Sequence, residues 1–208
     1  MALQALLSEV DPGWYSAGDE APPRELLERA RASTLGRRML ARWLAADAAP
    51  ALFAPRHADD AAAGTMVTRW TRTRLVAMVR DAGILAHAPA IRAEVGRDAV
   101  RRLRALLGNS YLLALDRGVW DGQVDARAQG QLSTALRQAL AAGDDAALLW
   151  LFERQGRSEL RHWATRRDPL LADWIALLHP REALVATHLP EKPLLRVVTH
   201  HESRAAAS

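Results

Sequence analysis

The chain has 208 residues, a formal net charge of +4 and no cysteine, and half of its residues are hydrophobic. Without cysteine it can have no disulfide framework, no thiolate nucleophile and no cysteine metal site. Its length suits one domain or two small ones, and abundant Leu and Ala with few Val, Ile, Tyr and Phe favour helices over a sheet.

The N-terminal part of the sequence predicts two helices. Residues 2–10 can form a short helix that ends at 11–13, and Pro23 opens a second helix that we expect to reach about Ala46. The stretch 48–64 is rich in Ala, Pro and Asp and predicts a mobile connection. These patterns indicate a loosely attached N-terminal helical segment over residues 1–64. The residues expected on the inner side of its second helix are Leu27, Leu35, Met39, Leu40, Trp43 and Leu44.

A main helical domain is predicted over residues 65–187. Its first helix begins near Thr65, another follows Asp98, and Asp168 is typical of an N-cap that opens a late helix. Residues 188–208 show no clear periodicity, so we expect an irregular tail. The predicted fold class is therefore all-α, a compact multi-helix domain with no sheet. The residues expected on apolar stripes include Leu75, Met78, Val79, Ala82, Leu85, Val100, Leu103, Leu107, Trp163 and Trp174.

Positive charge is concentrated between Arg69 and Arg104. This stretch holds nine arginines and three acidic residues, although the whole chain carries only +4. On the helix after Asp98, we expect Arg97, Arg101 and Arg104 to face away from the leucines. We therefore predict that these three arginines form a partner-binding surface.

Three aromatic residues lie outside the predicted apolar stripes. Trp14 and Tyr15 belong to a loop flanked by glycine and proline, and Trp120 belongs to a turn. Aromatic side chains in such places favour interfaces. We predict that Trp14, Tyr15 and Trp120 contribute to partner binding.

The sequence contains no recognisable catalytic or metal motif. No glycine-rich phosphate loop or nucleophile elbow occurs. The adjacent pair His200–His201 lacks the rigid partners of a metal site, and Glu159 and His162, three apart on a helix, suit a surface contact. We expect no enzymatic activity, no metal, no cofactor and no small-molecule substrate.

Nothing in the sequence is typical of a membrane or secretory segment. The longest apolar run, 146–152, is far shorter than the ~20 residues that cross a bilayer. The N-terminus lacks the basic region of a signal peptide. A cytoplasmic protein is therefore expected.

The segment 73–117 resembles the SctK family of type III secretion proteins. The matching features are AGILAH at 82–87, AIR at 90–92 and the amphipathic VRRLRALLGNSYLLAL at 100–115. The resemblance covers about a quarter of the chain, and it implies a cytosolic adaptor of the injectisome sorting platform, at the cytosolic face of the inner membrane. Such an adaptor contacts the cytoplasmic domain of an SctD-like ring protein and an SctQ-like pod protein, without catalysis or cofactor. The resemblance assigns no individual contact residue.

Other classes of function compete with this interpretation. An arginine-rich helical face also fits a small nucleic-acid-binding regulator, although the following stretch 111–115 is apolar rather than a set of base-reading residues. A secretion chaperone is a third hypothesis, but chaperones of that kind are usually acidic, whereas this chain has a pI of about 10.5. An enzyme acting through carboxylates or histidines ranks last.

Overall fold

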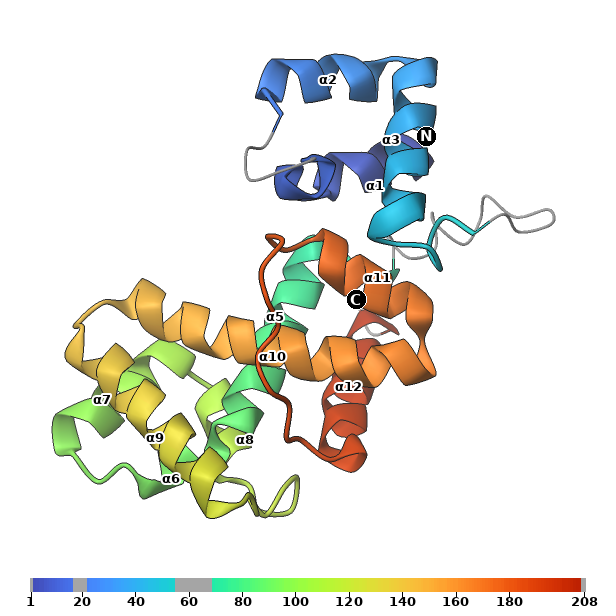
Figure 1. The fold of residues 1–208 in the computed structure, drawn as a ribbon. Coiled ribbons are helices and arrows are strands. Elements are labelled where there is room, and N and C mark those ends of the chain that lie inside the picture. The colour runs from blue at the N-terminus through green and yellow to red at the C-terminus, as the bar shows by residue number, and fades with distance from the viewer. Residues whose placement is uncertain (1, 17–21, 55–68, 207–208) are drawn as a thin grey trace. The chain divides into compact units, whose positions relative to one another are not determined.

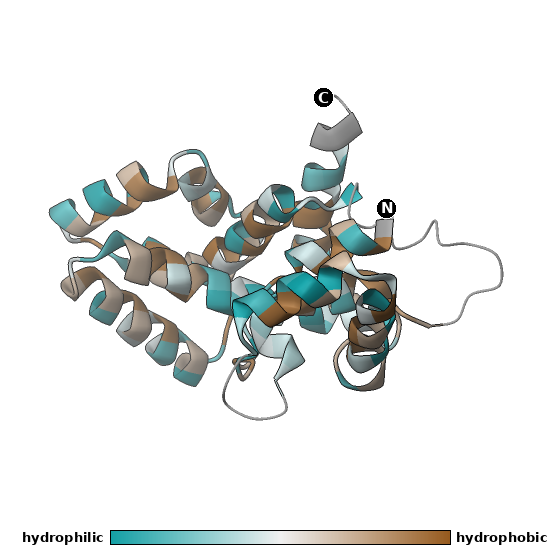
Figure 2. Cartoon of the chain, turned by 90° about the horizontal axis from the view of Figure 1, so that it is seen from above, coloured by the Kyte–Doolittle hydropathy of each residue, from teal (hydrophilic) through white to brown (hydrophobic). Residues whose placement is uncertain are grey.

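The computed structural model describes residues 2–16, 22–54 and 69–206. Within these residues every regular element is helical (Figure 1), so the predicted all-α class is confirmed. Hydrophobic and hydrophilic residues are interspersed along most of the helices (Figure 2). Much of the expected connection 48–64, and the expected helix start near Thr65, lie outside the described residues. The elements are α1 (Ala2–Glu9), the 3₁₀ helix η1 (Pro12–Tyr15), α2 (Arg24–Ala32), α3 (Thr34–Asp47), α5 (Arg72–Ala86), α6 (Ala88–Ala93), α7 (Arg97–Leu107), α8 (Ser110–Leu115), α9 (Ala126–Ala141), α10 (Asp145–Arg167), α11 (Pro169–Leu177) and α12 (Glu191–Ala206).

The chain divides into two compact units that differ from the predicted segments. Unit 1 comprises residues 1–75 and 161–183, and unit 2 comprises residues 76–160 and 184–208. The N-terminal helices therefore share a unit with α11, which lies far away in the sequence. The grouping follows from contacts between α11 and the N-terminal residues, such as the hydrogen bond from the Asp11 N–H to the Leu177 carbonyl at 2.8 Å.

Side chains of α11 hold the N-terminal part of unit 1 in place. The indole Nε1 of Trp174 donates a hydrogen bond to the carbonyl of Trp70 at 2.9 Å, and both residues are fully buried. The Asp173 carboxylate accepts the backbone N–H groups of Ala51 and Leu52 at 2.8 and 3.0 Å. Burial raises the pKa of Asp173. These long-range contacts connect the N-terminal part of unit 1 to α11.

The long helix predicted from Pro23 to about Ala46 is two helices. Ser33 separates α2 from α3 with an extended backbone, and its Oγ accepts the N–H of Gly36 at 2.9 Å as an N-cap. A Cβ at Gly36 would lie only 2.3 Å from the carbonyl oxygen of Ala30. The chain turns here because serine supplies the cap and glycine permits the close approach.

Two glycines bring α5 and α10 into backbone contact inside unit 2. A Cβ on Gly83 would lie 1.7 Å from the Phe152 carbonyl oxygen, and one on Gly156 would lie 1.8 Å from that of Val79. No other residue type fits at either position without moving a helix backbone. Elsewhere in this unit, α6 packs against α8 and α9, and α7 packs against α8 (Figure 1).

The tail expected to be irregular over residues 188–208 contains α12, and that prediction is wrong. Pro193 reads as a helix breaker in the sequence. It lies in the first turn of α12, however, where the missing N–H of proline breaks no hydrogen bond. The carboxylate of Asp81 on α5 joins α12 to α8: it lies 2.9 Å from Nε2 of His201 and accepts the Ser110 hydroxyl at 2.6 Å. The buried residues of α12 follow helical spacing and include Leu194, Val197, Val198 and His201.

Candidate functional site

The three aromatic residues predicted to contact a partner are buried. Trp14 is 8% exposed, and its Nε1 lies within hydrogen-bonding distance of the carbonyls of Ala176 and His179, at 3.0 and 2.8 Å. Tyr15 and Trp120 are 7% and 5% exposed. Their loops fold back onto the units, so the prediction that these side chains form an available surface is corrected: they belong to the interior.

Arg92 fixes the conformation of the turn around Trp120. Its guanidinium donates three hydrogen bonds, to the carbonyls of Ala114, Trp120 and Asp121, at 2.7, 2.8 and 2.8 Å. The planar fork of arginine suits such a set of acceptors. Burial lowers the pKa of Arg92, and the neighbouring Arg117 lowers it further. One arginine of the basic stretch therefore has a structural role.

Other arginines of the basic stretch also have internal partners. They form ion pairs with acidic residues that are distant in sequence but belong to the same unit. Arg72 pairs with Glu9 at 3.0 Å, Arg80 with Glu153 at 2.6 Å and Arg102 with Asp145 at 2.7 Å. Much of the charge concentrated in the sequence is thus matched by acidic groups in the fold.

The arginine face, which comprises Arg97, Arg101 and Arg104, remains exposed on α7. Leu103 and Leu107 of the same helix are buried, so the predicted orientation is confirmed. The ion pair of Arg101 with Asp98 spans 3.7 Å between two highly exposed side chains, and such a pair restrains the arginine only weakly. The structure therefore presents three cationic side chains on one short helix.

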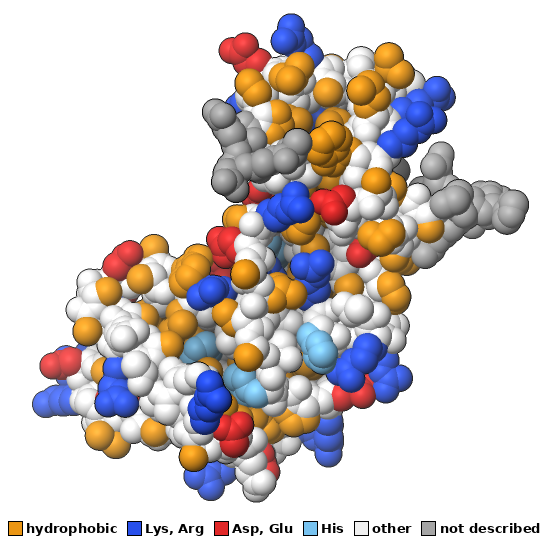
Figure 3. Space-filling view, viewed as in Figure 1, with side chains coloured by type: hydrophobic (Ala, Val, Ile, Leu, Met, Phe, Trp, Pro, Cys, Tyr) orange, Lys and Arg blue, Asp and Glu red, His pale blue; other side chains and the backbone are white. Residues whose placement is uncertain are grey.

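A second surface, which the sequence interpretation missed, lies on α3. Leu35, Met39 and Trp43 were expected inside, but they are 70%, 63% and 44% exposed. We call these three residues the apolar stripe; Arg38 and Arg42 of the same helix are also exposed. Orange hydrophobic and blue basic side chains appear together on the face of α1–α3 in Figure 3. These three side chains recur every fourth residue, so they share one face of the helix, and a contiguous apolar face of this kind can mark an interaction site.

A buried polar segment of α10 forms hydrogen bonds with the irregular connection that precedes α12. Glu159, expected on the surface with His162, is 1% exposed, whereas His162 is exposed. The Glu159 carboxylate accepts hydrogen bonds from the side-chain amide of Gln155 at 2.8 Å and from the backbone N–H groups of His188 and Leu189 at 2.9 and 3.1 Å. Glu159 is therefore an internal anchor, and the predicted surface pair is wrong.

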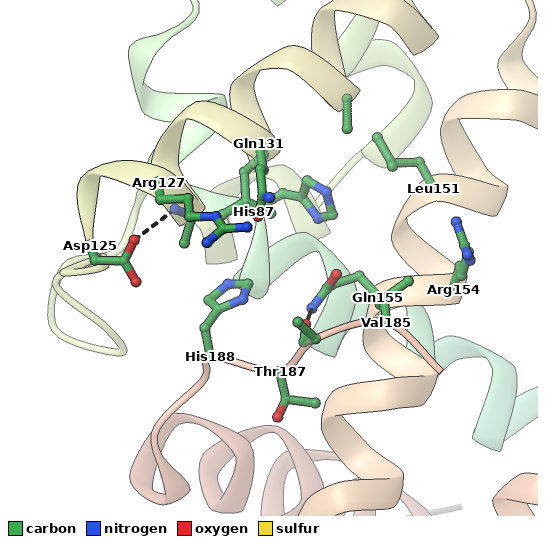
Figure 4. Close-up of a pocket in the computed structure, with 14 residues that line it drawn as sticks. His87, Asp125, Arg127, Gln131, Leu151, Arg154, Gln155, Val185, Thr187 and His188 are labelled. Carbon is green, nitrogen blue, oxygen red and sulfur yellow. Dashed lines mark hydrogen bonds between the residues drawn. The ribbon is translucent and has the colours of Figure 1, made fainter. Parts of the chain in front are cut away.

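A cavity of about 350 Å³ lies in unit 2 beside this anchor. The start of α9, the middle of α10, residues 185–188 and His87 form its wall. The side chains of Arg127, Gln131, His87 and His188 point toward one another around it (Figure 4). Leu132, Leu151 and Val185 add an apolar lining.

His87 is the most deeply buried polar group of the cavity wall. Its side chain is 1% exposed, and Nδ1 lies 2.9 Å from the carbonyl oxygen of Gly83. Burial lowers the pKa of His87 to about 4, and the nearby His188 contributes to the lowering. The ring is therefore neutral near pH 7.

The described residues hold no group of three histidine or acidic side chains that could ligate a metal. His201, which the sequence placed in a fraying pair, instead contacts Asp81, and His200 is exposed. In the same described part of the chain, none of the helices combines the length and apolarity needed to cross a membrane. Searches of protein-family models, of curated proteins and of solved structures found no match to the chain.

Proposed function

We propose that this protein is a non-enzymatic cytosolic adaptor of a bacterial type III secretion injectisome. The resemblance of residues 73–117 to the SctK family supplies the biological setting of this proposal. The observation that carries it is the arginine face: Arg97, Arg101 and Arg104 stay exposed while other arginines of the same stretch are paired internally. An exposed charged surface that is only weakly restrained from within the chain is suited to an acidic protein partner.

An adaptor must contact two partners, and the chain offers two chemically different surfaces. The arginine face belongs to unit 2, and the apolar stripe of Leu35, Met39 and Trp43 belongs to unit 1. The first surface favours an acidic partner through long-range attraction, and the second favours a partner with an apolar surface. The partners proposed from the SctK resemblance are the cytoplasmic domain of an SctD-like ring protein and an SctQ-like pod protein.

The test is charge reversal on the arginine face. In the variant Arg97→Glu, Arg101→Glu, Arg104→Glu, folding should persist because the substituted side chains are exposed and Leu103 and Leu107 are kept. Association with the partner should weaken and lose much of its salt dependence. The matched control is Arg29→Glu, Arg117→Glu, Arg137→Glu, which makes the same charge change at exposed positions outside this face.

Binding should be measured by titrating the purified chain with each secretion partner and with a labelled DNA duplex near physiological salt. Loss of partner binding in the first variant but not in the control supports the proposal. Tight binding of the wild-type chain to the duplex, with a steep salt dependence and no affinity for either secretion partner, would replace it with the nucleic-acid function.

A further inference from the structure

The cavity of unit 2 has the size of a small-molecule site. Its volume of about 350 Å³ lies at the lower end of the range of roughly 300–1,000 Å³ that ligand pockets occupy. Its apolar lining comes from Leu132, Leu151 and Val185, on three different segments. A compact organic molecule fits this space better than a dinucleotide or a peptide.

His87 offers the cavity a hydrogen-bond acceptor. Because the Gly83 carbonyl can only accept, the Nδ1 atom 2.9 Å away must carry the proton. In the neutral ring Nε2 then has a free lone pair, and no residue in the described part of the chain donates to it. An unused acceptor on a cavity wall can take an O–H or N–H donor of a bound molecule.

The charged groups of the wall favour an anion. Arg127 and Arg154 line the cavity, and neither forms an ion pair with any residue that the structure describes. Asp125 is the only acidic side chain of the wall, and its carboxylate is engaged as the N-cap of α9, 2.8 Å from the N–H of Ala128. The guanidinium of Arg127 points toward Gln131 and His87 (Figure 4). Guanidinium groups bind carboxylates through paired, charge-assisted hydrogen bonds.

We propose that this cavity binds a small organic carboxylate that also carries an O–H or N–H donor. Arg127 holds the carboxylate, with Arg154 adding positive potential from α10. The donor group binds Nε2 of His87, and the carbon skeleton rests on the apolar lining. The proposal does not depend on the adaptor function, since the arginine face of α7 takes no part in the cavity.

Matched ligands test the two recognition elements separately. Isothermal titration uses lactate and 4-hydroxybenzoate, each compared with the analogue that lacks the hydroxyl group, propionate or benzoate. Methyl 4-hydroxybenzoate removes the negative charge. At least one hydroxy acid should bind with one-to-one stoichiometry, and its deoxy analogue should bind roughly tenfold more weakly or not at all. The same loss is expected for methyl 4-hydroxybenzoate relative to 4-hydroxybenzoate.

Two variants place the binding in this cavity. Arg127→Gln should weaken the carboxylate roughly tenfold, whereas Arg137→Gln, at an exposed position on the same helix, should leave it unchanged. His87→Phe should abolish the preference for the hydroxy acid over its deoxy analogue, with circular dichroism reporting whether the fold is kept. Since Arg127 is exposed, that variant tests the site even where the buried substitution unfolds the chain.

The proposal is overturned by either of two results. One is that neither hydroxy acid gives saturable binding up to about 10 mM, a concentration at which any dissociation constant of about 1 mM or tighter would be detected. The other is that a hydroxy acid binds Arg127→Gln as tightly as it binds the wild-type chain.

Discussion

Helices α3 and α7 are both amphipathic, but α7 buries most of the apolar residues that its sequence pattern marks, whereas α3 exposes most of them. On α7, Leu103 and Leu107 are buried and the arginines face outward. On α3, Leu44 is buried, but most of the predicted inner face lies in solvent as the apolar stripe. The difference shows that a helical repeat locates an apolar face without showing how much of that face a neighbour covers.

The break at Ser33 shapes the surroundings of α3. It turns α2 back against α3, and Gly36 lets the two helices approach closely at the turn. On α3, Leu44 is fully buried, while Leu35 and Met39 are exposed. A binding partner for the apolar stripe would complete the burial that α7 achieves within its own unit.

The largest difference in lost stability is expected between alanine substitutions of two tryptophans in unit 1. Trp174→Ala should lower the free energy of unfolding by about 3–5 kcal/mol, because the side chain is fully buried and donates to the Trp70 carbonyl. Trp43→Ala should lower it much less, since Trp43 is 44% exposed, although it donates to the Trp14 carbonyl at 3.1 Å. Urea denaturation of both variants measures the difference. Equal losses would show that the apolar stripe is as well packed as the core.

Alanine substitution of one leucine on α7 and one on α3 compares the packing of the two helices directly. Leu103→Ala should cost about 2–5 kcal/mol because the side chain is fully buried. Leu35→Ala, at a side chain 70% exposed, should change stability by about 0.5 kcal/mol or less. If Leu35→Ala lowered the melting temperature as much as Leu103→Ala, α3 would be packed against a neighbour in solution.

A fall in pH tests the interior of unit 2. The pKa of His87 is about 4 in the folded state and 6.5 in an ordinary histidine, so between these values the unfolded chain takes up a proton that the folded chain does not. This residue alone should therefore reduce the free energy of unfolding by about 3 kcal/mol as the pH falls from about 6.5 to about 4. In His87→Phe, urea denaturation across this range should show a shallower pH dependence; an unchanged slope would contradict the assignment.

The smallest difference in lost stability is expected between the adjacent histidines of α12. His201→Ala should cost about 1–3 kcal/mol, because it leaves the Asp81 carboxylate without a partner on α12. His200→Ala, at an exposed position, should change stability by about 0.5 kcal/mol or less. Thermal melts of the two variants decide whether α12 is part of the core of unit 2. Identical melting temperatures would support the irregular tail that the sequence suggests.

Local patterns predicted much of the secondary structure and part of the candidate surfaces. The periodic leucines, the N-cap at Asp168 and the outward direction of Arg97, Arg101 and Arg104 follow from sequence spacing. The helix α12 was missed because Pro193 resembles a breaker unless its place in the first turn is known. The cavity was missed because its wall joins His87 to residues of α9 and α10 and to the segment 185–188.

The sequence by itself determined the helical class of this protein, since apolar spacing, caps and the scarcity of strand-forming residues are properties of neighbouring positions. It also determined which side of α7 is charged. Only the tertiary structure decided that Trp14 and Trp120 are buried, that Glu159 is an internal anchor and that the apolar stripe is exposed. The reason is physical: exposure depends on which distant segment covers a side chain, and here the covering contacts join residues more than a hundred positions apart, such as Trp14 and Ala176.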